Sequence, residues 1–567
     1  MGGFMLAFVQ ILTPAGGLLG STLLALVPVV LLLVLLAVFR LSAWKAVIIG
    51  AIVTVIMGIG IWHAPASLDL RAWLFGAFTG IWAIDWITFW GVVLYNTLVE
   101  TGVFGEFKSW LIRQATQDVR VQAILLAWSL GALLEGLVGF GYPWAVVAPI
   151  LVALGVVEID AIRVAAIANN APVSFGALGV PIITLAAVTG LPLMALSQSV
   201  GKIVAVLALL PPVILIVLVT GKKGLRHGWP LAVVGSLSYI LGQYPTSQFL
   251  GPYLPDVIGA LVSFAALLIL LHFWQPKVIL GYGGVPIEAG QTTVTPLAGE
   301  GGGAQMAAGQ PTSALLIGED GDPKAKFSAA EIVRMFLPFV ILIVVVVAMT
   351  GPWSKLPALT WFKLHVDTIS SLSHKALSVV FAFTPFVGGT EILISWILVL
   401  ILMRVKPSHA MSALSKSWSQ MWGAILVGPF IFGLAQSFNY SGMANSLAEG
   451  FSKIDTTFII LAPILGFIGV ALSGSNTATN AIFGAFQLSV GRLLHFPTLL
   501  LPSLNSVGAE VGKPVAPQTA SVGVATSTFV RNEGEVIRHN FGWTLFVLGW
   551  LIVVALLFYF FLPGSMV

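Results

Sequence analysis

Long apolar runs separated by short polar connections recur along the whole chain. The clearest are Ser21–Phe39, Lys45–Trp62, Ile203–Thr220, Val257–Trp274, Ile332–Met349 and Phe541–Leu562. A helix needs about 20 mostly apolar residues to cross a bilayer, and a window of that length finds about 12 to 14 candidate spans here. The runs are continuous rather than alternating, which favours helices over a β-barrel. The pattern therefore predicts an all-α, polytopic membrane protein.

Composition supports this prediction. The chain has 567 residues, of which 58% are apolar and 8% charged, with a mean hydropathy of +1.01. Soluble domains carry roughly 25% charged residues, so this chain has too few charged side chains to cover a water-exposed surface of its size. Cysteine is absent, which excludes disulfides and thiolate chemistry. The first apolar run lacks a basic stretch before it, so we interpret it as a retained helix rather than a signal peptide.

The net charge of +4 does not call for a nucleic-acid partner, because the basic residues lie in short connections between apolar runs. Arg40 and Lys45 flank the first connection, and Lys222, Lys223 and Arg226 lie in a later one. The positive-inside rule places these connections in the cytoplasm and the N-terminus outside.

One segment interrupts the membrane pattern. Residues 275–331 are rich in Gly, Thr, Ala and Pro and contain no apolar span. Such a composition cannot bury a core and predicts a hydrophilic linker. The linker would divide the chain into a first membrane half, residues 1–274, and a second, residues 332–567.

The two halves share a pattern of interrupted apolar runs. The first half has breaks near 131–143 and 169–181, and the second near 469–487 and 510–523. In each half a GxxLxG element, Gly131–Gly136 or Gly469–Gly474, precedes the earlier break. Broken backbone at membrane depth survives only where it lines a cavity or is buried in protein. Paired breaks in two halves indicate the binding site of a secondary transporter near the midplane.

The breaks contain the residues that could bind a small anion. These candidates are Ser475, Asn476, Thr477, Asn480, Lys513, Gln518, Asn169, Asn170 and Ser174. The tip Gly474–Asn480 suits a re-entrant hairpin, whose helix N-terminus would face an anion. The alternative is a polar contact between helices. Lys513 could pair with a carboxylate or extend to a loop, and the Asn169–Asn170 pair could be an ordinary helix end.

Three acidic residues lie within apolar runs. Glu135 is the first candidate for carrying a coupled proton, because an ionised carboxylate inside a membrane must be partnered, hydrated or protonated. Asp85 and Glu391 are weaker candidates for the same role. No metal-ligand cluster, nucleotide-binding loop or hydrolase motif accompanies them, so we expect no metal, no cofactor and no enzymatic activity. A channel also needs polar linings and is harder to exclude.

Five ordered motifs resemble the bacterial lactate permease family. They are Gly131–Pro143, Asn170–Pro181, Phe249–Asp256, Asn439–Gly442 and Gly474–Phe483, and the likeness runs from about Phe75 to the C-terminus. The resemblance implies a proton symporter for lactate or glycolate in the bacterial inner membrane, built from two inverted repeats with re-entrant hairpins. The chain departs from the family pattern at Tyr142-Pro-Trp144 and Val515-Ala-Pro517, which leaves the exact substrate open.

The sequence thus predicts a multi-pass secondary transporter that imports a short 2-hydroxymonocarboxylate with a proton. Its expected partners are the substrate, protons and lipid, with a homodimer as a candidate assembly. Ser475, Asn476, Thr477, Gln518 and Lys513 would hold the carboxylate, and Asn169, Asn170 or Gln518 would bind the 2-hydroxyl group. Sodium coupling is the alternative within transport, because hydroxyl and amide oxygens can also ligate a hard cation. An anion channel is the alternative from another class.

Overall fold

The computed structural model describes residues 8–287 except 40, 115 and 140, and residues 327–567 except 387, 525, 526 and 528–531. Of the described residues, 78% are helical, which confirms the all-α membrane class. The described residues hold ten helices long and apolar enough to cross a bilayer, or eleven if one bent pair counts as a span. This number is below the 12 to 14 expected, because a long stretch such as Leu193–Phe249 counts once although it contains α11 and α12, and other apolar runs form arms too short to cross.

The helices of the first half are α1 (Leu18–Ala37), α2 (Ala43–Gly60), α3 (Ala66–Thr79), α4 (Trp86–Glu100), α5 (Val103–Gln114), α6 (Val119–Gln122), α7 (Gly131–Leu137), α8 (Tyr142–Ala153), α9 (Glu158–Ala168), α10 (Gly176–Thr189), α11 (Leu193–Leu207), α12 (Pro211–Phe249) and α13 (Pro255–Phe273). Two π-helical stretches, Gly80–Asp85 and Ala123–Leu130, join α3 to α4 and α6 to α7. The span from Val119 to Leu137 is buried along its whole length and forms the centre of the molecule.

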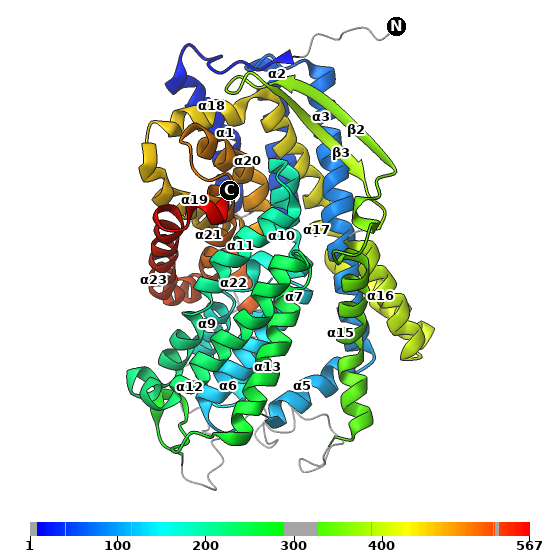
Figure 1. The fold of residues 1–567 in the computed structure, drawn as a ribbon, viewed down its shortest axis with the longest axis vertical. Coiled ribbons are helices and arrows are strands. Elements are labelled where there is room, and N and C mark those ends of the chain that lie inside the picture. Colours follow the sequence, from blue (N-terminus) through cyan, green and yellow to red (C-terminus); the bar gives the residue numbers. More distant parts are fainter. Residues whose placement is uncertain are drawn as a thin grey trace.

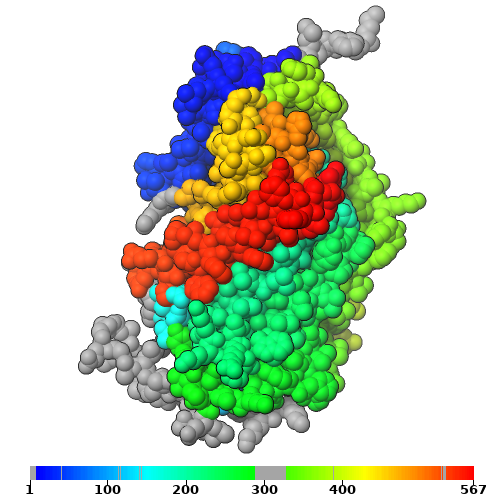
Figure 2. Space-filling model, turned by 60° about the vertical axis from the view of Figure 1, so that its left-hand side comes forward, coloured from blue at the N-terminus to red at the C-terminus, as the bar shows by residue number. Residues whose placement is uncertain are grey.

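The helices of the second half are α15 (Ala329–Thr350), α16 (Gly389–Leu402), α17 (Pro407–Ser441), α18 (Met443–Ser452), α19 (Phe458–Ser473), α20 (Asn476–Leu493), α21 (Leu500–Gly512), α22 (Pro517–Val524) and α23 (Glu533–Phe560). Figure 2 shows α23 as an oblique band across one face, between the segments coloured yellow to orange and the green segments of the first half.

The two halves of the sequence share one core. From the first half, α2 and α3 pack against α17, α1 packs against α18, and α10 packs against α20. Several of these crossings are very close: a Cβ added to Gly76 or Gly80 would lie 2.4 Å from a backbone oxygen of α17. Glycine is needed at such points because the helix backbones themselves are in contact.

A small sheet covers one end of the bundle, near the upper ends of α2 and α3 in Figure 1. Strand β2 (Phe362–Ile369) pairs antiparallel with β3 (Ala376–Phe383), and β1 (Phe8–Val9) pairs parallel with β2. Val366 and Val379 are buried against Ala72 of α3 and Tyr440 of α17. The sheet therefore ties the start of the chain to the second half.

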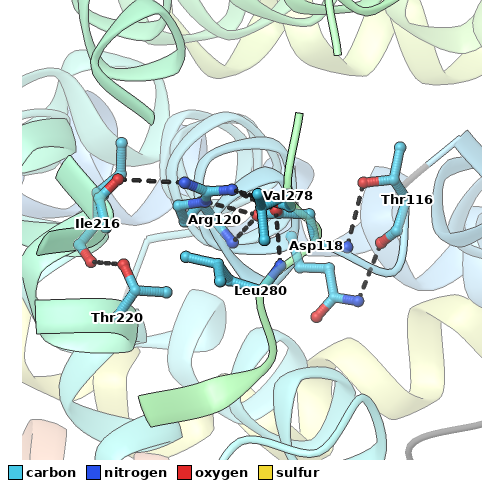
Figure 3. A network of polar contacts seen from close by, with 9 residues as sticks. Thr116, Asp118, Arg120, Ile216, Thr220, Val278 and Leu280 are labelled. Atoms are coloured by element: carbon cyan, nitrogen blue, oxygen red, sulfur yellow. Dashed lines mark hydrogen bonds and ion pairs between the residues drawn. The ribbon is translucent and has the colours of Figure 1, made fainter. Parts of the chain in front are cut away.

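A fully buried ion pair fastens the opposite end of the bundle (Figure 3). Arg120 lies 2.6 Å from Asp118 and also donates to the carbonyl of Val278 at 2.8 Å, and the N–H of Leu280 donates to Asp118 at 3.1 Å. These bonds hold residues 278–280, the first part of the predicted linker, against the start of α6. Residues 288–326 of that linker lie outside the described part of the chain.

Candidate functional site

Four helix–break–helix elements converge in the middle of the protein. They pair α7 with α8, α9 with α10, α19 with α20, and α21 with α22. All four breaks fall in the regions where the sequence predicts interruptions. The arms of α9 and α10 meet at a bend of 66°, and the interruption lies at residues 169–175, followed by left-handed backbone at Ala177, Leu178 and Gly179.

Local sequence explains the break between α19 and α20. Gly474 ends α19 with φ +73°, a conformation that favours glycine. A Cβ at this position would also lie 2.6 Å from Cβ of Gln518, so the tip can touch α22 only without a side chain. Ser475 then caps α20, and its Oγ accepts a hydrogen bond from the N–H of Ala478 at 3.1 Å.

The tips line part of a cavity of about 400 Å³. One wall consists of residues from the broken elements, including Glu135, Ser475, Asn476, Lys513 and Gln518. The other wall consists of residues from α2, the π-helical stretch, α4 and α17, and is mostly apolar apart from Asp85 and Thr88. A small organic molecule with one charged end would fit a site of this volume and lining.

The charged end of the cavity is a buried ion pair. Lys513 Nζ lies 2.6 Å from Oε1 of Glu135, and the two side chains are 6% and 2% exposed. Nδ2 of Asn169 donates to the other oxygen of Glu135 at 3.1 Å. Gly176 makes room for this carboxylate, because a Cβ there would lie 2.7 Å from Oε1. The pair joins the first and second halves of the chain across 378 residues.

The N-terminus of α20 faces the same cavity. Asn476, Thr477 and Ala478 form its first turn, and all three line the cavity. The first N–H groups of a helix have no partner within the helix, and together with the helix dipole they attract an anion. The ammonium group of Lys513 and this helix end thus place two sources of positive potential at one cavity.

The predicted site residues divide into those that line the cavity and those that support it. Ser475, Asn476, Thr477, Lys513, Gln518, Glu135 and Asp85 line it. Asn169, Asn170, Ser174, Asn480 and Glu391 are buried outside the lining. Asn480 connects α20 to α10 and α21 by three hydrogen bonds. It donates to the carbonyl of Pro181 at 3.0 Å and to Ser506 at 3.1 Å, and it accepts from Asn505 at 2.9 Å. Ser174 contacts Ser506 at 3.3 Å, which joins the break between α9 and α10 to α21.

Two further buried carboxyl groups lie close to this ion pair and were not among the sequence candidates. Glu510 precedes Lys513 by one turn and accepts a hydrogen bond from the N–H of Ser174 at 3.1 Å. Asp256 accepts from the hydroxyl of Tyr239 at 2.8 Å. Both are within electrostatic range of Glu135 and Lys513. The sequence signal was available, since Asp256 ends one of the five motifs and Glu510 borders a break.

The chain is similar to several known proteins. The family model described as "L-lactate permease" matches residues 21–562. Glycolate permease GlcA of Escherichia coli (strain K12) is 32% identical over 99% of this chain and 100% of its own length. The L-lactate permease of Bacillus subtilis (strain 168) is 31% identical over 95% of this chain and 96% of its own length. Among solved structures, MtrF of Neisseria gonorrhoeae shares the fold, with a TM-score of 0.50 and 11% identity over 94% of this chain and 97% of that one.

Proposed function

This chain belongs to the L-lactate permease family, and from that premise we propose that it is a secondary active transporter of the bacterial cytoplasmic membrane. It imports lactate, glycolate or a similar short 2-hydroxymonocarboxylate together with a proton. The relatives named above support the substrate class. The single observation that carries the mechanism is the Glu135–Lys513 ion pair, which lies at 2.6 Å on the wall of the cavity.

The substrate carboxylate binds at the positive end of the cavity. Lys513 supplies a point charge, Gln518 an amide donor, and the first turn of α20 at Ser475–Thr477 backbone N–H groups. The remainder of a lactate molecule is small and largely apolar, which fits the aliphatic residues of the other wall.

Competition for Lys513 provides the coupling. When the substrate carboxylate pairs with Lys513, Glu135 loses its cation in a site that is almost closed to solvent. An unpaired buried carboxylate costs several kcal/mol, so Glu135 takes up a proton as the anion binds. One anion and one proton enter together, and the net charge of the site does not change. Asp85 and Glu391 are the next candidates for the proton if Glu135 does not carry it.

Uptake by proteoliposomes tests this function. Vesicles with an alkaline interior should accumulate labelled lactate in the absence of sodium, and Lys513→Met should abolish both uptake and lactate exchange. Lys202→Met is the matched control, because Lys202 is a half-buried lysine that donates to the carbonyl of Ser565 at 2.7 Å outside the cavity lining. Normal lactate uptake by folded Lys513→Met would contradict the proposed site.

The same vesicles separate the rival mechanisms. Accumulation that requires sodium and ignores the pH gradient would indicate sodium coupling. A flux that does not saturate and shows no counterflow of labelled lactate against unlabelled lactate would indicate an anion channel.

A further inference from the structure

Asp85 has an unusual position in the cavity. It ends the π-helical stretch Gly80–Asp85 and lies on the wall formed by this stretch, α4 and α17, whereas Lys513 and Ser475 lie on the wall formed by the broken elements. Its side chain is nine-tenths buried, and among the described residues Oδ2 has no hydrogen-bond partner. A buried carboxyl oxygen without a partner is costly, so its presence needs a reason.

The packing around Asp85 keeps a place for this carboxyl group. A Cβ on Gly428 of α17 would lie 2.4 Å from each of its two oxygens, so any larger residue there would displace it. Of the other residues that line this wall, Ile84, Val427 and Ile431 are aliphatic, and the hydroxyl group of Thr88 donates to the carbonyl of Ile84 at 2.8 Å. Lys513 is the single cation among the described lining residues, and its ammonium group already forms an ion pair with Glu135. Asp85 therefore lines the cavity with a carboxyl group whose buried Oδ2 receives no hydrogen bond from any described residue. A π-helical turn at this point is a further sign, because such turns often occur at functional sites.

We infer that Asp85 is a specificity-determining residue, whose carboxyl group accepts a hydrogen bond from the 2-hydroxyl group of the substrate. This inference rests on the proposed function, since it assumes that the substrate carboxylate binds on the wall that carries Lys513. The inference places the hydroxyl end of such an acid at Asp85, which lines the same cavity. A carboxyl oxygen can accept this bond whether the group is charged or protonated.

The chemical consequence is discrimination against acids that lack the hydroxyl group. Propionate has the size and charge of lactate but leaves Asp85 without a donor. Sites built to pair with a substrate hydroxyl reject the analogue that lacks it much more strongly than apolar pockets reject an extra group. The loss of one hydrogen bond that involves a carboxylate corresponds to about a ten- to hundredfold preference for lactate over propionate.

Competition in counterflow measures this preference. Reconstituted protein exchanges labelled lactate, and unlabelled lactate or propionate competes for the site at fixed pH. Asp85→Leu and Asp85→Ala remove the acceptor, so the preference should fall to about threefold or less through weaker lactate binding, while propionate competes as before. Asp85→Asn keeps an acceptor oxygen and should retain most of the preference. Thr79→Val, on α3 outside the cavity lining and bonded to its own helix, should behave like the unsubstituted protein.

The outcomes separate this inference from the proposed function. An unchanged lactate-to-propionate ratio in a folded Asp85→Leu or Asp85→Ala protein overturns the inference. It is also overturned if Asp85→Asn and Asp85→Leu lose proton-driven accumulation but keep the ratio, because Asp85 then carries the proton. Failure of the unsubstituted protein to exchange lactate overturns the proposed function itself.

Discussion

Replacing Glu135 with glutamine separates substrate binding from proton coupling. Glutamine has the shape of a protonated glutamate but cannot release or take up a proton. In the structure Oε1 of Glu135 lies 2.6 Å from Nζ of Lys513, so Glu135 competes with the substrate for the same ammonium group. Glu135→Gln removes this competitor and leaves Lys513 available to the anion. The variant should therefore bind lactate at neutral pH and exchange it, but it should not accumulate lactate in response to a pH gradient.

The size of the effect follows from the bond that is removed. A hydrogen bond to a charged group contributes about 1.5–3 kcal/mol, which corresponds to about ten- to hundredfold tighter lactate binding in Glu135→Gln at neutral pH. The pH dependence changes as well. Where the native protein takes up one proton for each anion bound, its lactate Kd rises about tenfold for each unit of rising pH, since the proton becomes scarcer. The glutamine variant takes up no proton, so its Kd should stay constant over the same range.

Calorimetric titration of purified protein between pH 5.5 and 8.5 measures both effects, and proteoliposome uptake measures accumulation. Glu100→Gln is a matched control. Glu100 also forms an ion pair, with Lys416 at 3.2 Å, but neither residue lines the cavity. A Kd of Glu135→Gln that follows pH with the native slope would refute the reasoning. The coupled proton would then have to be assigned to another carboxyl group, with Asp85 or Glu391 tested next.

Three further substitutions test the architecture of the site. Asn476→Ala should weaken lactate binding by about ten- to hundredfold in binding assays through loss of a polar contact at the tip, whereas Leu241→Ser on the exposed face of α12 should not; unchanged affinity in the folded variant would exclude the tip as the site. Gly176→Ala should lower transport and Tm, because its Cβ would lie 2.7 Å from the buried carboxylate of the ion pair, and a native Tm would show that the carboxylate can move aside. Arg120→Met should cost about 3–5 kcal/mol in unfolding experiments, since it leaves Asp118 buried without its cation; a loss below about 1 kcal/mol would mean that water or a proton compensates.

The local features of the site could be predicted because they depend on backbone chemistry close in sequence. Gly474 and Ser475 specify a helix end followed by a helix start. Glycine and serine have these capping preferences in any helix, so the break can be predicted from the sequence. The long apolar runs specify helices in a bilayer, because hydrocarbon leaves no other way to satisfy the backbone. The resemblance of five motifs then indicated the family, which the comparisons confirm.

The roles of single polar residues within the breaks could not be read in this way. Asn476 and Asn480 lie four residues apart in the same motif, yet Asn476 lines the cavity, whereas Asn480 does not and bonds to Pro181 and Asn505. Both asparagines have the same hydrogen-bonding capacity, so only the elements packed around each one decide its use. Glu510 was overlooked for the same reason, since a glutamate near a helix end usually faces solvent and here the packing of α21 buries it completely.

The sequence by itself therefore determined that this protein crosses a membrane repeatedly, where its helices break and which side chains lie at the breaks. Only the tertiary structure decided that Glu135 and Lys513 pair with each other, since each could have found another partner or none. It also decided that Asp85 lines the same cavity and that no described residue donates to its Oδ2. The physical reason is range: backbone preferences act over a few residues, whereas charge pairing and cavity shape depend on segments hundreds of residues apart that meet only when the helices pack.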